Sequence, residues 1–249
     1  MAEDITAKED ADRLKTEFIS IASNKLSEPL RSLRLALHAV IEGHTGELTT
    51  EQREMLTEAR QNAEQLDEIM SDLLELAEIE SGARQISAAT LRPIDIARAA
   101  LDHFQAAAES KHVRLVNDVW PDLPPVVADR QAVKRIFDNL LSNAIRHTER
   151  DGQVTIGATE ISGRVMFSVR DTGEGIPEEY LPRIFDRFIQ VSGRAGGGTG
   201  LGLALAKRLV EAQAGQIRVE CRAGEGTTFT FTLPTGRGQG SGVSRNEEL

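Results

Sequence analysis

The feature that most constrains this chain is a pair of long apolar stripes near its N-terminus, separated by a short turn. In residues 13–41, apolar side chains recur every three or four positions, which is the spacing of one helix face. Residues 42–48 contain two glycines and predict a turn, and a second stripe follows in residues 49–81. Thr49 and Gln52 predict a capping box at the start of the second helix, and Gly82 predicts its end.

Two helices of about 45 Å each, joined by a short turn, would form an antiparallel hairpin. One hairpin alone has a thin core and leaves its apolar stripes half exposed, whereas two hairpins complete a four-helix bundle. We therefore predict a homodimer through residues 13–41 and 49–81. Ten acidic and two basic residues between positions 51 and 80 indicate an acidic outer face, for which solvation is a sufficient explanation.

The rest of the chain predicts a mixed α/β layer. Helical patterns at about 93–108, 129–147 and 201–213 are interspersed with short strand-like runs between residues 113 and 234, and this mixture is typical of an α+β fold with a largely antiparallel sheet. The predicted organisation is as follows: 1–12, a flexible remnant of an incoming signalling helix; 13–85, the hairpin; 91–234, the α/β domain; 235–249, a glycine-rich disordered tail.

Composition argues against several classes of function. The net charge of −10 and an aromatic content of 4% disfavour a nucleic-acid-binding surface. The single cysteine, Cys221, cannot form an internal disulfide, which fits a reducing compartment. No apolar run approaches the roughly 18 residues of a membrane helix, and no signal peptide is evident. We expect a cytoplasmic protein, or the cytoplasmic part of a membrane-bound sensor.

Three short motifs in the second half predict a phosphate site. Asn139 and Asn143 are four residues apart and share one helix face, where amide oxygens suit a Mg²⁺ ion bound mainly through phosphate. Asp171 opens a glycine turn at residues 171–176 and can accept a hydrogen bond from an amino group such as that of adenine. Residues 196–203 form a glycine loop before a helix, a common phosphate site. Each motif alone is weak, but their order favours a nucleotide.

This order, with residues 183–188 between the second and third motifs, resembles the catalytic and ATP-binding domain of sensor histidine kinases. The resemblance equates the four segments with the N, G1, F and G2 boxes of that family, and it implies a two-layer α/β sandwich with a lid at about residues 189–197. It implies that Asp171 binds the adenine amino group, and that Asn143, with Asn139 close by, coordinates Mg²⁺. The remaining ATP-binding residues implied are Arg146, His147, Gly173, Gly175, Ile176, Arg194, Gly198, Thr199, Gly200, Leu201 and Gly202.

The same family carries a phosphoacceptor histidine in its first helix, within the pattern Ser-His-Glu-Leu-Arg/Lys-Thr-Pro-Leu. Residues 23–30 of this chain read Ser-Asn-Lys-Leu-Ser-Glu-Pro-Leu. Asn24 therefore stands in place of the histidine, Lys25 in place of the acid, and Glu28 in place of the threonine, while Pro29 keeps the family's helix kink. An amide nitrogen is not a usable nucleophile, and a carboxylate at position 28 would repel a phosphoryl group.

We therefore expect a histidine-kinase core that binds Mg-ATP but has lost phosphoryl transfer at the usual position. Its expected partner is a response-regulator receiver domain or a competent kinase subunit. One alternative is an active kinase that phosphorylates a partner subunit in trans or uses another acceptor. Another is an ATPase of the gyrase and mismatch-repair type, which is disfavoured by the preceding hairpin. A third is a module that no longer binds ATP. The remaining histidines are expected at the surface: His38, His44, His103 and His112.

Overall fold

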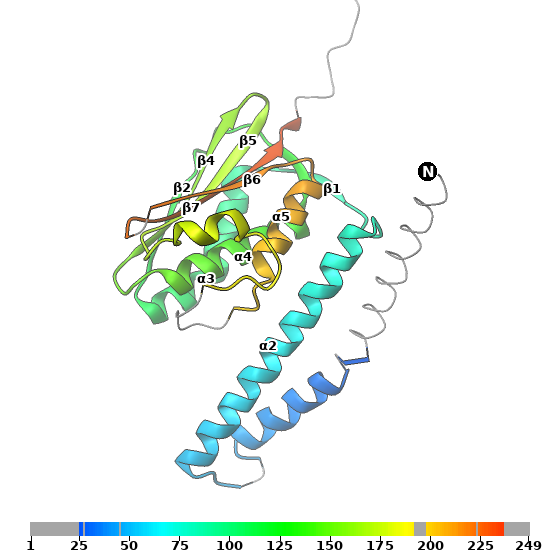
Figure 1. The fold of residues 1–249 in the computed structure, drawn as a ribbon, viewed down its shortest axis with the longest axis vertical. Helices are drawn as coiled ribbons and strands as arrows, with labels where there is room; N and C mark the ends of the chain where they lie inside the picture. Colours follow the sequence, from blue (N-terminus) through cyan, green and yellow to red (C-terminus); the bar gives the residue numbers. More distant parts are fainter. Residues whose placement is uncertain (1–24, 27, 45, 192–197, 223, 237–249) are drawn as a thin grey trace, which may run out of the picture. The chain divides into compact units, whose positions relative to one another are not determined.

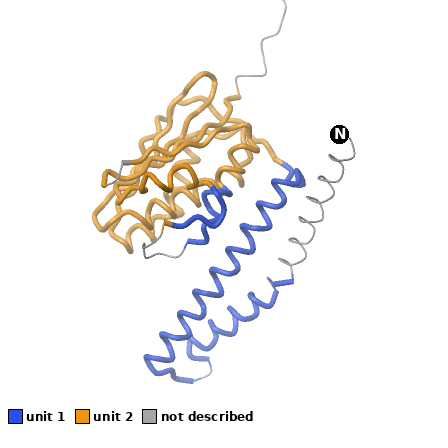
Figure 2. The backbone as a smooth tube through the Cα atoms, viewed as in Figure 1, with its two compact units in different colours: residues 1–85, 186–190, 197–205 blue, residues 86–185, 191–196, 206–249 orange. Residues whose placement is uncertain are grey.

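A computed structural model describes residues 25–26, 28–44, 46–191, 198–222 and 224–236. The chain divides into two units, drawn in different colours in Figure 2. Unit 1 comprises residues 1–85, 186–190 and 197–205, and unit 2 comprises residues 86–185, 191–196 and 206–249. The predicted N-terminal remnant, the phosphoacceptor position Asn24 and most of the glycine-rich tail lie outside the described residues.

Unit 1 contains the helical hairpin. Residues 28–41 are helical, and after the turn α2 spans Thr50–Glu80. The predicted capping box is present, since the Thr49 hydroxyl accepts from the Gln52 amide at 3.2 Å and the Gln52 side chain accepts from the Thr49 amide at 2.9 Å. At the other end Gly82 has a φ of +69°, the left-handed conformation that commonly follows a helix.

The hairpin has a thin core, as its sequence predicts. The two helices are joined by an ion pair between Arg34 and Asp67 at 2.9 Å and by a hydrogen bond from the Arg53 guanidinium to the Ile41 carbonyl at 2.8 Å. Much of the apolar stripe nevertheless faces solvent in the single chain, so the hairpin does not bury its own apolar surface. The large apolar side chains left exposed on it are Leu26, Leu33, Leu35, Met55 and Leu66.

Unit 2 is built on a five-stranded sheet with the order β2-β4-β5-β7-β6. The β2–β4 pair is parallel and the other three pairs are antiparallel. A separate antiparallel pair joins β1 and β3; these two strands have four residues each and escaped prediction because so short a run carries little periodicity. The strands are β1 Ala88–Leu91, β2 Arg114–Asp118, β3 Val126–Asp129, β4 Gln153–Ile161, β5 Arg164–Asp171, β6 Ile217–Arg222 and β7 Gly226–Pro234.

Helices α3 (Pro93–Lys111) and α4 (Arg130–His147) cover one face of this sheet (Figure 1). Phe137 of α4 packs edge-on against Phe167 of β5 and Phe231 of β7, with ring centroids 5.6 and 5.2 Å away. All three rings are fully buried, and they fix α4 against the middle of the sheet. A short 3₁₀ helix, η1 (Glu178–Arg183), follows β5, and α5 spans Gly202–Ala212.

The helical hairpin followed by an α/β sandwich confirms the predicted fold class. Helix α3 is longer than its sequence pattern indicated, because it continues to Lys111 and ends at His112, whose φ is +59°. Within the ranges given above, none of the helices combines the length and apolar character needed to cross a bilayer.

Replacing Phe167 by alanine is expected to lower the free energy of unfolding by about 3–5 kcal/mol, because a buried ring is lost from a packed cluster. Urea denaturation followed by circular dichroism measures this change. The matched control is Ile161→Ala at the exposed end of β4, where the side chain is 45% exposed and a loss below about 1 kcal/mol is expected. Equal losses in both variants would contradict the assignment of Phe167 to the core.

Candidate functional site

The site begins where the turn after β5 meets the C-terminal end of α4. A Cβ atom at Gly173 would lie 2.3 Å from the His147 carbonyl oxygen, so only glycine allows the two segments to approach this closely. Gly175, two residues on, has a φ of +74°, a conformation that other residues rarely adopt. The glycines of the turn therefore hold residues 171–176 against the end of the helix.

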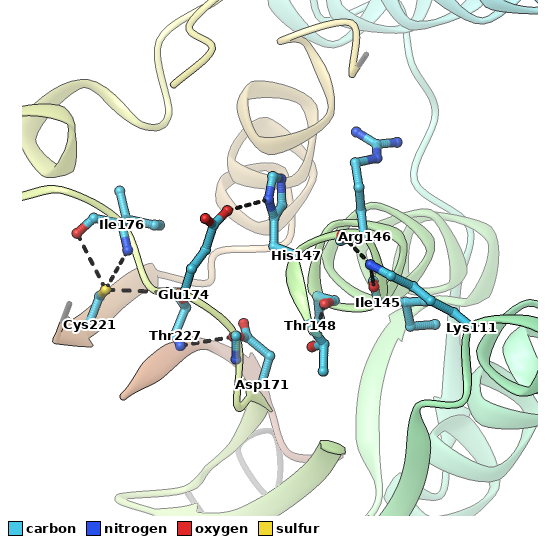
Figure 3. A network of polar contacts seen from close by, with 12 residues as sticks. Lys111, Ile145, Arg146, His147, Thr148, Asp171, Glu174, Ile176, Cys221 and Thr227 are labelled. Atoms are coloured by element: carbon cyan, nitrogen blue, oxygen red, sulfur yellow. Dashed lines mark hydrogen bonds and ion pairs between the residues drawn. The ribbon is translucent and has the colours of Figure 1, made fainter. Parts of the chain in front are cut away.

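Asp171, the last residue of β5, is 3% exposed. Its Oδ1 atom accepts hydrogen bonds from the backbone amides of Gly173 at 2.9 Å and of Thr227 at 3.1 Å. Within the described residues Oδ2 accepts no hydrogen bond, so this oxygen is left for a ligand. Figure 3 shows the carboxylate between the turn and Thr227 of β7.

Burial raises the pKa of the Asp171 carboxyl above its usual range, against the opposing effects of the two backbone hydrogen bonds and of His147. A native pKa above the unfolded one means that the buried charge costs stability once the pH exceeds the native pKa. The arrangement therefore holds a strong hydrogen-bond acceptor in place and lowers the stability of the unliganded fold.

His147 joins α4 to the turn by a second contact. Its Nδ1 lies 3.2 Å from Oε1 of Glu174 (Figure 3). Arg146, the preceding residue, is exposed. His147 thus leaves the end of α4 beside the turn that holds Asp171, and the structure brings these two predicted residues close together in unit 2.

Asn139 and Asn143 are half-buried on the face of α4 that they share. The Asn139 Nδ2 atom is buried and makes no hydrogen bond within the described residues. A buried unsatisfied donor costs about 1–3 kcal/mol, and an oxygen of a bound phosphate or its water would satisfy it. No cluster of three or more His, Cys, Asp or Glu able to hold a metal occurs among the described residues. The side-chain oxygens of the two asparagines are of the kind that suits a Mg²⁺ ion held chiefly by phosphate.

Two residues that sequence reasoning missed support the turn from the other side. The Ile176 amide donates to Sγ of Cys221 on β6 at 2.8 Å, and the Thr227 amide of β7 donates to Asp171. Gly226 makes this approach possible, since a Cβ there would lie 2.0 Å from the Asp171 carbonyl oxygen. A glycine at a strand end often marks a close backbone approach, and it was the only local signal available.

The second glycine loop lies in unit 1, where it packs against the end of the F box. The Phe188 amide donates to the Gly200 carbonyl at 2.8 Å, and a Cβ at Gly200 would lie 2.8 Å from the Phe188 Cα. The side chain of Gln190 donates to the Gly198 carbonyl at 2.7 Å, and the Thr199 hydroxyl accepts from the Leu201 amide at 3.2 Å. Helix α5 begins next, at Gly202.

Other predicted residues belong to unit 1, are exposed elsewhere on unit 2, or lie outside the described residues. Lys25 and Glu28 are helical and exposed, whereas Asn24 and Arg194 are not described. The four histidines considered as alternative acceptors are all exposed: His38, His44, His103 and His112.

Two family matches cover most of the chain. Residues 14–82 match the His Kinase A (phospho-acceptor) domain. Residues 128–237 match the family of histidine kinase-, DNA gyrase B- and HSP90-like ATPases. The match that includes position 24 thus precedes the match that includes Asp171 and the glycine boxes.

Individual relatives agree with these matches. The chain is 31% identical over 214 residues to the alginate biosynthesis sensor protein KinB of Pseudomonas aeruginosa, covering 86% of this chain and 36% of KinB. It is 33% identical over 220 residues to the sensor histidine kinase WalK of Bacillus subtilis, covering 86% of this chain and 36% of WalK. Full-length ShkA in complex with AMPPNP superposes with a TM-score of 0.74 at 31% identity, over 88% of this chain and 46% of ShkA.

The chain therefore contains a phosphoacceptor-type helical domain followed by an ATPase domain. It is homologous to sensor histidine kinases, a class of ATP-dependent enzymes of two-component signalling. It spans about a third of the length of the two curated relatives above.

Replacing Asp171 by asparagine should change the stability of the fold and its affinity for nucleotide in opposite directions. The amide oxygen can still accept from the Gly173 and Thr227 amides, but an NH₂ group then occupies the ligand-facing position. We expect ATP affinity to fall about 10- to 150-fold, as for loss of a hydrogen bond to a charged group. Titration calorimetry with Mg-ATP measures this loss.

The stability of the same variant should depend on pH in a defined direction. The contribution of wild-type Asp171 to the free energy of unfolding is lost as the pH rises through its raised native pKa. Asparagine does not titrate. The variant should therefore gain stability relative to wild type as the pH rises from about 4 to neutrality. Thermal unfolding across this pH range measures the gain, and a relative loss would show that the Asp171 charge stabilises the unliganded fold.

Proposed function

We propose that this chain is a kinase core that binds Mg-ATP and does not accept phosphate at Asn24. The observation that carries the first part is the Asp171 carboxylate. One of its oxygens is saturated by two backbone amides while the other is left for a ligand. An adenine amino group is a donor that fits the remaining oxygen.

The residues around Asp171 take defined roles in this proposal. Asn143, with Asn139, would hold Mg²⁺, which when bound would neutralise charge on the triphosphate. Arg146 and His147, at the end of the same helix, would contact phosphate or ribose. The glycines at 173, 175, 198, 200 and 202, with Ile176, Thr199 and Leu201, would shape the backbone around the nucleotide, and Arg194 would reach the terminal phosphate.

The second part of the proposal depends on the residues at the phosphoacceptor box. Attack on the γ-phosphate needs a lone pair on the acceptor, and the Asn24 amide nitrogen is conjugated with its carbonyl. Lys25 and Glu28 reverse or add charge at the two flanking functional positions. The leucines and the proline of the box are kept, so the hairpin retains its packing while the acceptor chemistry is absent.

The apolar stripe exposed on the hairpin supports the predicted homodimer. Residues such as Leu33 and Leu66, each about half exposed in the single chain, would be buried in a four-helix bundle. A chain that binds ATP but lacks an acceptor has two natural partners, a response-regulator receiver domain and a competent kinase subunit. Because ATP is the ligand, we place this core in the cytoplasm.

Calorimetric titration of the chain with ATP in the presence of Mg²⁺ tests the binding step. We expect saturable binding with a dissociation constant between about 1 µM and 1 mM, the usual range for enzyme substrates. Omission of Mg²⁺ should weaken ATP binding more than adenosine binding, because the ion contacts phosphate. A wild-type chain that shows no binding at millimolar ATP would overturn the proposal and favour a module without nucleotide function.

Incubation with γ-labelled ATP tests the acceptor. The wild-type chain should show no acid-labile phosphate, and the double variant Asn24→His with Lys25→Glu should become labelled. Labelling of the wild-type chain that persists after replacement of His38 and His44 would contradict the loss of acceptor chemistry and require another acceptor.

Mixed subunits distinguish a kinase acting in trans from an inert core. One subunit carries the restored box together with Asp171→Asn, so that it can accept but not donate phosphate. The other is the wild-type chain, which can bind ATP but has Asn24. Label on the first subunit in the mixture, and not in either protein alone, would establish both the dimer and transfer in trans.

A further inference from the structure

The C-terminal end of α4 is supplied with donors by side chains outside the helix. The last carbonyls of a helix have no partner within it. Here the amide and the hydroxyl of Thr148 both donate to the Ala144 carbonyl, at 2.9 and 2.7 Å. The ammonium group of Lys111 donates to the next two carbonyls, those of Ile145 at 2.9 Å and Arg146 at 2.5 Å (Figure 3).

Lys111 is held in this position by the backbone around it. It is the last residue of α3, and the following residue, His112, turns the chain in a left-handed conformation. The Asp151 amide then donates to the His112 carbonyl at 2.9 Å, and the Arg114 amide donates to the Gly152 carbonyl at 2.9 Å. These bonds fasten the end of α3 to the turn after α4. They therefore fix the backbone position from which the half-buried Lys111 side chain extends.

The charge of Lys111 matters because of what lies at this helix end. A helix C-terminus carries about half a negative charge, which repels an approaching anion. Arg146 and His147 leave α4 here, and the glycine turn of Asp171 touches the His147 carbonyl. Arg146 extends from this helix end. Without a cation at the carbonyls, the negative end of the helix dipole would face the phosphates there.

We propose that Lys111 is a positioning residue for nucleotide binding. Its ammonium group cancels the negative end of α4 and fixes the Ile145 and Arg146 carbonyls, so that Arg146 and His147 face the nucleotide from a neutralised helix end. The role rests on the proposed function, since it presupposes a phosphorylated ligand at this end of α4. It predicts an effect that grows with ligand charge, which a role in folding alone does not.

Calorimetry on Lys111→Gln tests this role with three ligands: ATP, ADP and adenosine. Glutamine retains a donor for one carbonyl but lacks the charge, so the fold should be kept. We expect ATP affinity to fall about 5- to 30-fold, ADP affinity to fall less, and adenosine affinity to change less than about 2-fold. Raising the salt concentration should shrink the ATP effect, and Lys111→Arg should restore most of the affinity.

Arg98→Met is the matched control. Arg98 is an exposed cation on the same helix, thirteen residues before Lys111 and hence about 20 Å away along α3. Its replacement removes the same charge and should leave all three affinities unchanged. Equal losses for ATP and adenosine in Lys111→Gln, an unchanged ATP affinity, or an equal ATP loss in Arg98→Met would each overturn the positioning role. Failure of the wild-type chain to bind any of the ligands would overturn the proposed function as well.

Discussion

The candidate site depends on one close contact between backbones, that of the turn after β5 with the end of α4. Gly173 has no room for a side chain because the His147 carbonyl occupies that space. The same turn directs the Gly173 amide to Asp171. A single steric condition therefore places the carboxylate of one motif beside the helix end of another. The Thr227 amide of β7 and the Cys221 sulfur of β6 support the turn from the other side.

Packing in the core of unit 2 fixes the position of α4 and therefore this contact. Helix α4 buries Phe137, Leu140 and Leu141 completely, while Asn139 and Asn143 on its flank stay half-buried. The side chains toward the sheet set the height and rotation of the helix, and the two asparagines on its flank stay partly accessible. Stability of the unliganded fold is not maximised, since Asp171 is buried with a raised pKa and Asn139 has an unsatisfied amide. Such features are typical of binding sites.

The hairpin and the α/β unit differ in which of their residues match the family pattern. In the phosphoacceptor box the packing residues match the family pattern, whereas Asn24, Lys25 and Glu28 do not. In the second half of the chain, the residues of the nucleotide motifs match the pattern of the family, glycines included. On the function proposed above, such a core would be better suited to act on, or alongside, another protein than on itself.

The amino-acid sequence by itself determined the hairpin, the capping box of α2, the sheet's main strands and the position of each nucleotide motif, because these depend on periodicity and on neighbours within a few residues. The short strands β1 and β3 and the contacts of Thr227, Cys221 and Lys111 were decided only by the tertiary structure. Thr227 contacts a residue 56 positions away, and Lys111 contacts a carbonyl 34 positions away. No local pattern encodes such pairs, since packing of α3 and α4 on the sheet brings them together.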